Sequence, residues 1–312
     1  MTISNYLLAV DGDNALHRAY YGNPSTDAPK GIRLNGIKTF FSSINKQLRR
    51  NYYDHLTIAW DIRSERLLRT ALLAPYDVVY KEDRTKGLTE EQIFRREEIR
   101  QQKIVCHNLL VAMSIPSNLS DKKVNGVEAD DILASISTKV KLERVDVLTS
   151  DKDLAQLLTE DKIQIYNPRK NKLVDEFECE EFFGVPPSQI VDLLCLVGDS
   201  ADNVPGIRGC GPKTAIKLLN QYGSLEGIVA NKKHIKGVVG KTLMAKDHLP
   251  IDVLRQVITV DTKVYKRKDP ELDPYYMNID RIRTHVNAHR DSIERIKSNI
   301  GFDGMLMAEI GI

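Results

Sequence analysis

The sequence lacks the features that mark secreted, zinc-thiolate and membrane-spanning proteins. Its 312 residues include only four cysteines, and no two of them form a C-x-x-C pair. A disulfide framework and a thiolate zinc site are therefore not expected, and we predict reduced, mostly structural cysteines. No apolar run approaches the roughly 20 residues that span a bilayer, and no apolar leader follows Met1. We therefore predict a cytoplasmic protein that does not contact membranes.

Net charge is also small, because 45 basic residues nearly balance 43 acidic ones and leave +2 at pH 7. Hydrophobic residues make up 42% of the chain and charged residues 28%. This composition is typical of a folded globular protein and unlike that of a disordered or fibrous one, and the length is enough for one large domain or two smaller ones. The charge balance alone neither favours nor excludes a polyanionic partner.

Strand-like and helix-like segments alternate in the first half of the chain. Residues 6–10, 56–60 and 144–148 are short, apolar and β-prone, whereas residues 36–50 and 127–140 carry apolar side chains at three-to-four spacing. This alternation predicts an α/β domain.

The second half is predicted to be helical from about residue 186. Before it, residues 80–102 carry many charges of both signs and few apolar side chains, which indicates an exposed, mobile helical segment. A solvated helix face with i,i+4 ion pairs is the alternative explanation. Apolar periodicity interrupted by Gly-containing turns indicates helices at 188–197, 212–222, 224–231, 251–258 and 279–300.

Each predicted strand of the first half leads into an aspartate. Asp11 and Asp61 follow directly, and Asp151 follows after two small polar residues. The C-terminal ends of parallel strands form the crevice in which open α/β sheets bind ligands. One such aspartate would mean little, but three form a pattern.

A second group of acids opens the predicted helix at 127–140. Glu128 and Asp131 share a helix face, and Asp130 lies beside them. Three acids so close repel one another unless a cation lies between them, and oxygen-only ligands suit Mg²⁺ or Mn²⁺. Acids that complement the helix dipole are the alternative, but the dipole accounts for only one or two of the three.

Two further pairs, Asp151 with Asp153 and Asp199 with Asp202, lie near predicted element boundaries, where each could also be an ordinary turn or cap. So many carboxylates suit two or more divalent ions, and two metals about 4 Å apart promote in-line displacement at phosphorus. Setting nine acids aside leaves 34 of the 43 acidic residues against 45 basic ones, so we predict an acidic pocket within a basic remainder. The nine acids expected to converge on one crevice are Asp11, Asp61, Glu128, Asp130, Asp131, Asp151, Asp153, Asp199 and Asp202.

A glycine-rich segment joins two of the predicted helices in the second half. It is not a P-loop, because Pro212 separates Gly211 from Lys213 and no strand is predicted before it. We predict instead a hairpin whose amides, with the N-terminus of the following helix, face a phosphate of a nucleic-acid backbone without reading bases. An ordinary glycine-rich turn is the alternative. The candidate binding residues are Gly206, Gly209, Gly211, Lys213, Thr214 and Lys217.

The order of these motifs resembles that of the 5′-nuclease or flap endonuclease family, especially the stand-alone bacteriophage 5′-3′ exonucleases and the 5′-nuclease domain of bacterial DNA polymerase I. The resemblance covers roughly residues 5–265. It is carried by Val10-Asp11-Gly12, Tyr80-Lys81-x-x-Arg84, Gly126-x-Glu128-x-Asp130-Asp131, Ser150-Asp151-x-Asp153-Leu154, and Gly198-Asp199-x-x-Asp202 with the hairpin after it.

The resemblance implies a mostly parallel central sheet with helices on both faces, a helical arch at about residues 80–105 and a helix-hairpin-helix element at about residues 190–222. The nuclease core would span residues 1–187, and a helical DNA-binding region with a C-terminal tail would span residues 188–312. Because the segment between Asp61 and Lys81 is longer than usual for the family, the place of the family's arginine there stays open between Arg66 and Arg69.

The resemblance also implies roles for individual residues. The nine acids would hold the metal ions, and Lys81 and Arg84 would contact the scissile phosphate. A potassium ion would bind hairpin carbonyls. Tyr80 or Tyr20 is a candidate for stacking on an unpaired base.

The implied activity is that of a divalent-metal phosphodiesterase, a structure-specific 5′ nuclease that acts as flap endonuclease and 5′-3′ exonuclease in DNA replication or repair. It would use two or more Mg²⁺ or Mn²⁺ ions and take DNA with a 5′ flap or 5′ end, with an RNA–DNA hybrid as a further candidate substrate. We expect a monomer in the cytoplasm, that of the host if a bacteriophage encodes it, working alone or with separate replication proteins. A catalytically inactive branched-DNA-binding protein is the alternative, and a single-strand ribonuclease would not need the hairpin.

Overall fold

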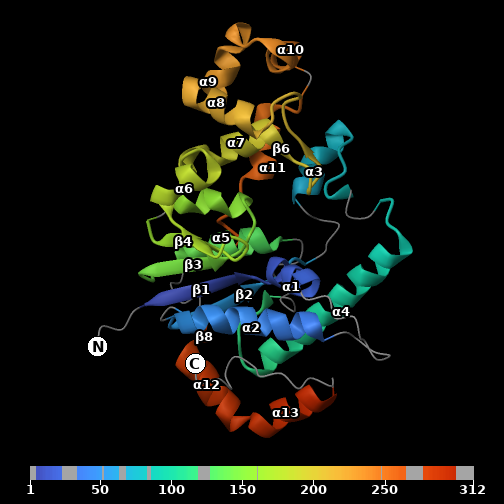
Figure 1. Ribbon diagram of the computed structural model, residues 1–312, viewed down its shortest axis with the longest axis vertical. Coiled ribbons are helices and arrows are strands. Elements are labelled where there is room, and N and C mark those ends of the chain that lie inside the picture. The colour runs from blue at the N-terminus through green and yellow to red at the C-terminus, as the bar shows by residue number, and fades with distance from the viewer. Residues whose placement is uncertain are drawn as a thin grey trace.

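A computed structural model describes residues 5–22, 34–50, 53–62, 68–82, 86–118, 127–159, 161–246, 248–264 and 277–299. The described part is elongated, with the central sheet in its lower half and a group of helices above it (Figure 1). Helix α4 (Glu90–Ala112) leaves the lower half at a slant. The architecture is mixed α/β, as the sequence predicts.

Six strands form the central sheet in the order β5-β4-β3-β1-β2-β8. The inner strands are parallel, and the edge strands β5 and β8 pair antiparallel with their neighbours. The predicted mostly parallel sheet is therefore confirmed. The strands are β1 (Tyr6–Asp11), β2 (His55–Ala59), β3 (Arg144–Leu148), β4 (Ile163–Asn167), β5 (Lys172–Val174) and β8 (Met277–Asn278).

The registers of the parallel strands bring their carboxyl ends to one edge of the sheet. Asp11 at the end of β1 is opposite Ala59 at the end of β2, and Val10 is opposite Leu148 at the end of β3. Side chains that follow these strands therefore lie close together, and this common edge positions the site.

Side chains of β1 alternate between two cores, and helices cover both faces of the sheet. Leu8 and Val10 belong to one core, and Leu7 and Ala9 belong to the other. The first core is covered by α1 (Gly12–Gly22), α2 (Asn35–Arg50), the last turns of α4, α12 (Ile279–Ala288) and α13 (Arg290–Asn299), and the second by α5 (Ala129–Lys139) and helices of the second half.

The second half is helical, as predicted. Helix α8 has Pro212 at its first position and ends before Gly223, whose φ of 80° suits a residue without a side chain. Between α7 and α8, the short strands β6 (Gly198–Asp199) and β7 (Val204–Pro205) form an antiparallel pair. The helices are α6 (Glu176–Phe183), α7 (Ile190–Val197), α8 (Pro212–Tyr222), α9 (Leu225–Ala230), α10 (Gly237–Ala245) and α11 (Ile251–Ile258), with 3₁₀ turns η5 (Asp153–Thr159), η6 (Pro187–Gln189) and η7 (Lys232–His234).

Two segments differ from the sequence prediction. The single helix expected over residues 279–300 is two helices, α12 and α13, with a turn at His289 between them. The charged segment at 80–102 contains only the first part of α4, which follows α3 (Leu68–Leu73) and η1 (Ala74–Tyr76). Phe94 near the start of α4 is exposed, whereas Leu109 near its end is fully buried. The last turns of α4 are therefore anchored in the core while its first half projects.

All four cysteines are free and buried, as predicted. Within the described ranges, none of the helices has the length and apolarity needed to cross a membrane.

Gly12 leaves no room for a side chain at the start of α1. A Cβ there would lie 2.6 Å from the Trp60 ring and 2.8 Å from the Ala59 carbonyl oxygen. We expect Gly12→Ala to lower the free energy of unfolding by about 1–3 kcal/mol, measured by urea unfolding. Gly22→Ala is the matched control, since a Cβ there meets nothing within 4 Å and alanine is the better helix former. Equal losses in the two variants would contradict the packing argument.

Candidate active site

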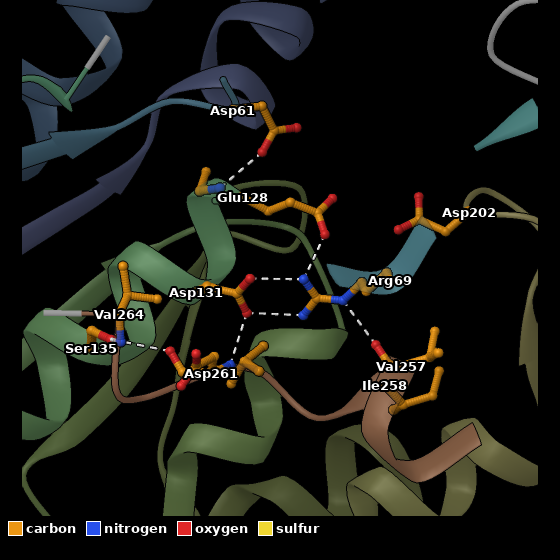
Figure 2. A network of polar contacts seen from close by, with 12 residues as sticks. Asp61, Arg69, Glu128, Asp131, Ser135, Asp202, Val257, Ile258, Asp261 and Val264 are labelled. Carbon is orange, nitrogen blue, oxygen red and sulfur yellow. Dashed lines mark hydrogen bonds and ion pairs between the residues drawn. The ribbon is translucent and has the colours of Figure 1, made fainter. Parts of the chain in front are cut away.

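The aspartates that follow β1 and β2 are held by backbone and hydroxyl donors. Asp11 is buried, and its carboxylate accepts from the Asn14 amide at 3.0 Å and from the Thr149 hydroxyl at 2.9 Å. Asp61 accepts from the Ala129 amide at 2.9 Å and so reaches the first turn of α5 (Figure 2). Both carboxylates are therefore fixed at the carboxyl edge of the sheet.

The acids of α5 lie at the same edge. Glu128 is the N-cap residue of α5, but its side chain makes no capping bond. Its carboxylate instead accepts from the Tyr80 hydroxyl at 3.1 Å and contacts Lys81. Asp130 lies close enough to Asp151 for repulsion between the two to affect its ionisation. The start of α5 thus places acids between the strand ends and the helical second half.

The remaining acids come from the segment after β3 and from the α7–α8 connection. The Asp153 amide donates to Asp151 at 3.0 Å, and Asp202 accepts from the Tyr80 hydroxyl at 2.7 Å. Asp199 is buried in β6. Together these segments form an open pocket lined by Asp130, Asp153, Asp199 and Asp202, with Arg69, Tyr80, Val204, Val257, Ile258 and Val260.

Burial and mutual repulsion raise the pKa values of Asp11, Asp130, Asp151 and Asp153. Desolvation, and then the charge of Asp61, raise the pKa of Asp11 to about 7, although hydrogen bonds to its carboxylate act in the opposite direction. The pKa values of Asp130 and Asp153 are raised well above their usual range by burial first, and next by the charge of Asp151. Acids in this state gain from a bound cation, because the cation favours their charged form.

Lys81 supplies a positive charge at these acids. Its ammonium contacts Glu128 and lies 3.7 Å from Asp202 and 4.0 Å from Asp61. Its backbone amide donates to the Asp202 carbonyl at 2.8 Å. Its φ of 57° is left-handed, which costs a residue with a side chain about 1–3 kcal/mol. Tertiary contacts therefore hold Lys81 in an unfavourable backbone conformation at the centre of the site.

The donor set suits hard divalent cations, since the candidate ligands are all carboxylate oxygens. Asp153 Oδ1 is buried and has no hydrogen-bond partner among the residues that the structure describes, which leaves this oxygen available to a cation. Among the described residues, no three acids surround one point as the ligands of a single ion would. Lys81 and Arg69 contact Glu128 instead. The residues fit metal ions by their chemistry, and binding would require some of the acids to move toward a common point.

Asp131 differs from the other predicted acids in its contacts. Both of its oxygens accept from Arg69, at 2.7 and 2.9 Å, and one also accepts from the Asp261 amide at 2.8 Å. Asp131 is thus the predicted acid whose two oxygens are both held by one arginine.

Neither tyrosine predicted to stack on a base presents its ring at the surface. Tyr80 is 9% exposed, with its hydroxyl on Asp202, and Tyr20 is 5% exposed and donates to Glu98 at 2.6 Å. In this arrangement both rings are packed inside the protein, so the structure does not support the stacking prediction. Arg84 and Arg66 lie outside the described residues.

The predicted hairpin lies between α7 and α8. Gly206 packs inside it, because a Cβ there would lie 2.4 Å from the Gly198 amide nitrogen. Its absence of a side chain therefore permits the close approach of this backbone to β6. Gly206 is half-buried, whereas Gly209 and Gly211 are exposed. The remaining predicted hairpin residues are all exposed, namely Gly209, Gly211, Lys213, Thr214 and Lys217.

Sequence reasoning missed the residues that support the acids. The side-chain oxygen of Asn14 accepts from the Ser150 amide at 3.2 Å and from the Ser150 hydroxyl at 2.9 Å. These bonds join α1 to the segment after β3. Lys103 of α4 donates to both oxygens of Asp13 at 2.8 Å and to the Asp61 carbonyl at 2.7 Å. The position of Asn14 in the first helical turn after Asp11 could have indicated its role, but no sequence pattern relates Lys103 to Asp13.

Family models match both halves of the chain. The one described as 5′-3′ exonuclease, N-terminal resolvase-like domain, matches residues 6–184, and the one described as 5′-3′ exonuclease, C-terminal SAM fold, matches residues 185–296. A 5′-3′ exonuclease of Aquifex aeolicus is 31% identical over 227 residues, which are 72% of this chain and 72% of that protein. DNA polymerase I of Mycobacterium leprae is 31% identical over 304 residues, which are 95% of this chain but only 30% of the polymerase.

Solved structures with the same fold include two from bacteriophage T5. The T5 5′-exonuclease with bound zinc has a TM-score of 0.69 at 20% identity, covering 95% of this chain and 98% of that one. The T5 flap endonuclease in a complex with DNA and metal ions has a TM-score of 0.66 at 21% identity, covering 95% and 97%. At these identities the likeness establishes the fold.

Carboxylates gathered where parallel strands end, next to a helical region with an exposed glycine hairpin, are typical of nucleases that act on a phosphate backbone. Within that class the two family models account for the chain from residue 6 to residue 296. The chain belongs to the 5′-3′ exonuclease family. The sequence-based prediction of a 5′ nuclease is thereby confirmed.

The raised pKa of Asp11 predicts how stability depends on pH in the absence of metal ions. The folded protein keeps a proton on Asp11 up to about pH 7, whereas the unfolded chain releases it near a pKa of about 3.9. Because the folded state then binds more protons, the contribution of this group lowers the free energy of unfolding as the pH rises from about 4 to 7.

We therefore expect Asp11→Asn to raise the melting temperature of the metal-free protein at pH 7 and to change it little at pH 4. Calorimetry in EDTA measures both values. An Asp11→Asn variant that melts below the wild type at pH 7 would contradict the assignment.

Proposed function

We propose that this protein is a structure-specific 5′ nuclease that hydrolyses DNA at a 5′ flap or a 5′ end with two or more Mg²⁺ or Mn²⁺ ions. The observation that carries the proposal is the meeting of buried and half-buried carboxylates from β1, the segment after β2, α5, the segment after β3 and the α7–α8 connection. Repulsion among them opposes folding, and a bound cation relieves it. An acidic pocket of this kind therefore suits a metal site better than a structural role.

Individual residues have separate tasks in this mechanism. Bound divalent ions stabilise charge at phosphorus and lower the pKa of a water molecule. Lys81 would donate to the scissile phosphate from its place among Glu128, Asp61 and Asp202. Arg84 is proposed for the same phosphate on the family resemblance. The acids proposed to hold the ions are Asp11, Asp61, Glu128, Asp130, Asp151, Asp153, Asp199 and Asp202.

The helical second half would hold the duplex. Exposed backbone and side chains of Gly209, Gly211, Lys213, Thr214 and Lys217 are suited to phosphates and do not read bases. The same proposal includes a potassium ion at the hairpin carbonyls and an RNA–DNA hybrid as a further substrate. It also includes a monomer that works in the cytoplasm, alone or with separate replication proteins. The chain would divide near residue 187 into a nuclease core and a DNA-binding region.

A 5′-labelled flap duplex incubated with Mg²⁺ tests the proposal. We expect a labelled product whose length places the cut near the junction of single strand and duplex, and no product in EDTA. Binding without cleavage, also in Mn²⁺, would instead favour a catalytically inactive branched-DNA-binding protein. Cleavage restricted to unpaired RNA would favour a single-strand ribonuclease.

Asp153 offers a sharp test of the metal site, because one of its oxygens is buried without a partner. We expect Asp153→Asn to reduce cleavage by about 100-fold or more, while DNA binding in EDTA stays the same or becomes tighter because one repelling charge is gone. Cleavage rates and fluorescence anisotropy measure the two effects. Asp161→Asn, at an exposed position outside the site, is the control, and unchanged turnover in Asp153→Asn would count against the metal assignment.

Lys213 tests the role of the hairpin. Since it is exposed on α8, we expect Lys213→Ala to weaken binding to all DNA sequences alike and to reduce the slope of log Kd against log salt by about one phosphate contact. Binding titrations at several salt concentrations measure this slope. Lys46 is exposed on α2, which covers the sheet face opposite to the helical second half. The variant Lys46→Ala should therefore leave the salt slope unchanged. A loss confined to particular sequences would contradict backbone binding.

A further inference from the structure

Arg69 of α3 uses all three of its guanidinium nitrogens within the protein. Nη1 donates to Glu128 Oε2 at 2.5 Å and to Asp131 Oδ2 at 2.7 Å, and Nη2 donates to Asp131 Oδ1 at 2.9 Å (Figure 2). Nε donates to the Val257 carbonyl at 2.8 Å. The side chain is only 11% exposed. The guanidinium at the pocket wall is therefore held by protein acceptors through each of its nitrogens.

The same network joins α5 to the segment that follows α11. Asp131 accepts from the Asp261 amide at 2.8 Å. Ser135, further along α5, donates to the Asp261 carbonyl at 3.1 Å and accepts from the Val264 amide at 3.0 Å. Helix α11 packs on both α3 and α7, and α7 leads into β6 with Asp199. Arg69 thus lies where the acids of α5 meet the helical second half.

We propose that Arg69 is a positioning residue of the nuclease site, which holds Glu128 beside Tyr80 and Lys81, keeps Asp131 away from the metal ions and ties both acids to α11. This inference rests on the proposed function and deepens it. It gives Arg69 a role that acts through the carboxylates, while Arg66, the other arginine that the sequence leaves open, lies outside the described residues.

A lysine in place of Arg69 would keep the charge but not the network. The two parallel bonds to Asp131 depend on the planar fork of the guanidinium, and Nε supplies a further bond in the same plane. An ammonium is a compact donor and cannot reproduce this geometry. In Arg69→Lys, therefore, Asp131 would be free to turn toward the pocket and Glu128 would lose its fixed orientation.

The test compares Arg69→Lys with the wild type in cleavage kinetics, DNA binding in EDTA and Mn²⁺ binding by calorimetry. We expect kcat to fall about 10- to 100-fold, as for small displacements in an active site. The Kd for Mn²⁺ should rise about 10-fold, as for the loss of a residue that orients metal ligands. The KM and the Kd for DNA should change by less than about twofold, because no phosphate contact is lost.

Arg255→Lys is the matched control. Arg255 on α11 also bridges two carboxylates, Asp192 at 2.9 Å and Glu226 at 2.5 Å, and neither belongs to the site. We expect this variant to melt at a lower temperature, as Arg69→Lys does, while its Mn²⁺ affinity stays that of the wild type. In addition, Arg69→Lys combined with Asp131→Asn should bind Mn²⁺ no more weakly than Arg69→Lys alone, since the pair is already broken.

The contrary outcomes are distinct. A weaker affinity for DNA with unchanged kcat and Mn²⁺ affinity would make Arg69 a substrate contact and overturn the inference. If activity falls in both Arg69→Lys and Arg255→Lys in proportion to the folded fraction, the role of Arg69 is purely structural. That outcome would also overturn the inference. If the wild type binds Mn²⁺ but does not cleave DNA, the proposed function is refuted and the inference about Arg69 is not. The Mn²⁺ affinities of the wild type and Arg69→Lys would still decide the role of Arg69. Absence of Mn²⁺ binding would refute both.

Discussion

Repulsion among buried and half-buried carboxylates is the interaction on which the other features of this structure depend. Desolvation and neighbouring charges raise the pKa values of Asp11, Asp130 and Asp153, with Asp61 acting on Asp11 and Asp151 acting on Asp130 and Asp153. The surrounding groups offset this. Amides of Asn14 and Ala129 donate to the acids at the strand ends. The cationic side chains of Arg69 and Lys81 contact Glu128.

A further consequence is that the site exists only when both halves of the chain are packed together. Asp11 comes from the first strand, whereas Asp199 and Asp202 come from the α7–α8 connection. The backbone of Lys81 bonds to that of Asp202, and Lys103 of α4 bonds to the carbonyl of Asp61. Segments distant in sequence thus meet at the acids, and the helical second half completes the site besides carrying the hairpin.

The sequence predicts those parts of the fold and site that depend on local chemistry or on strand register. Helix α8 is predicted with its observed bounds, because Gly211, Pro212 and Gly223 mark its ends. The acids at the strand ends are predicted because parallel strands share an edge. The partners of Arg69 are not predictable in this way, since nothing local relates it to Asp131 or Val257. The turn at His289 is likewise unmarked, because neither glycine nor proline interrupts the pattern there.

The two edges of the central sheet are closed by short antiparallel strands. At one edge the described residues of β8 pair with His55 and Leu56, and α12 follows at once with Ile279 and Ile282 in the core. At the other edge β5 pairs over three residues. An open strand edge is a template on which another chain can add a strand. These brief edge strands leave little such template, so a sheet built from long buried parallel strands is protected against edge-to-edge aggregation.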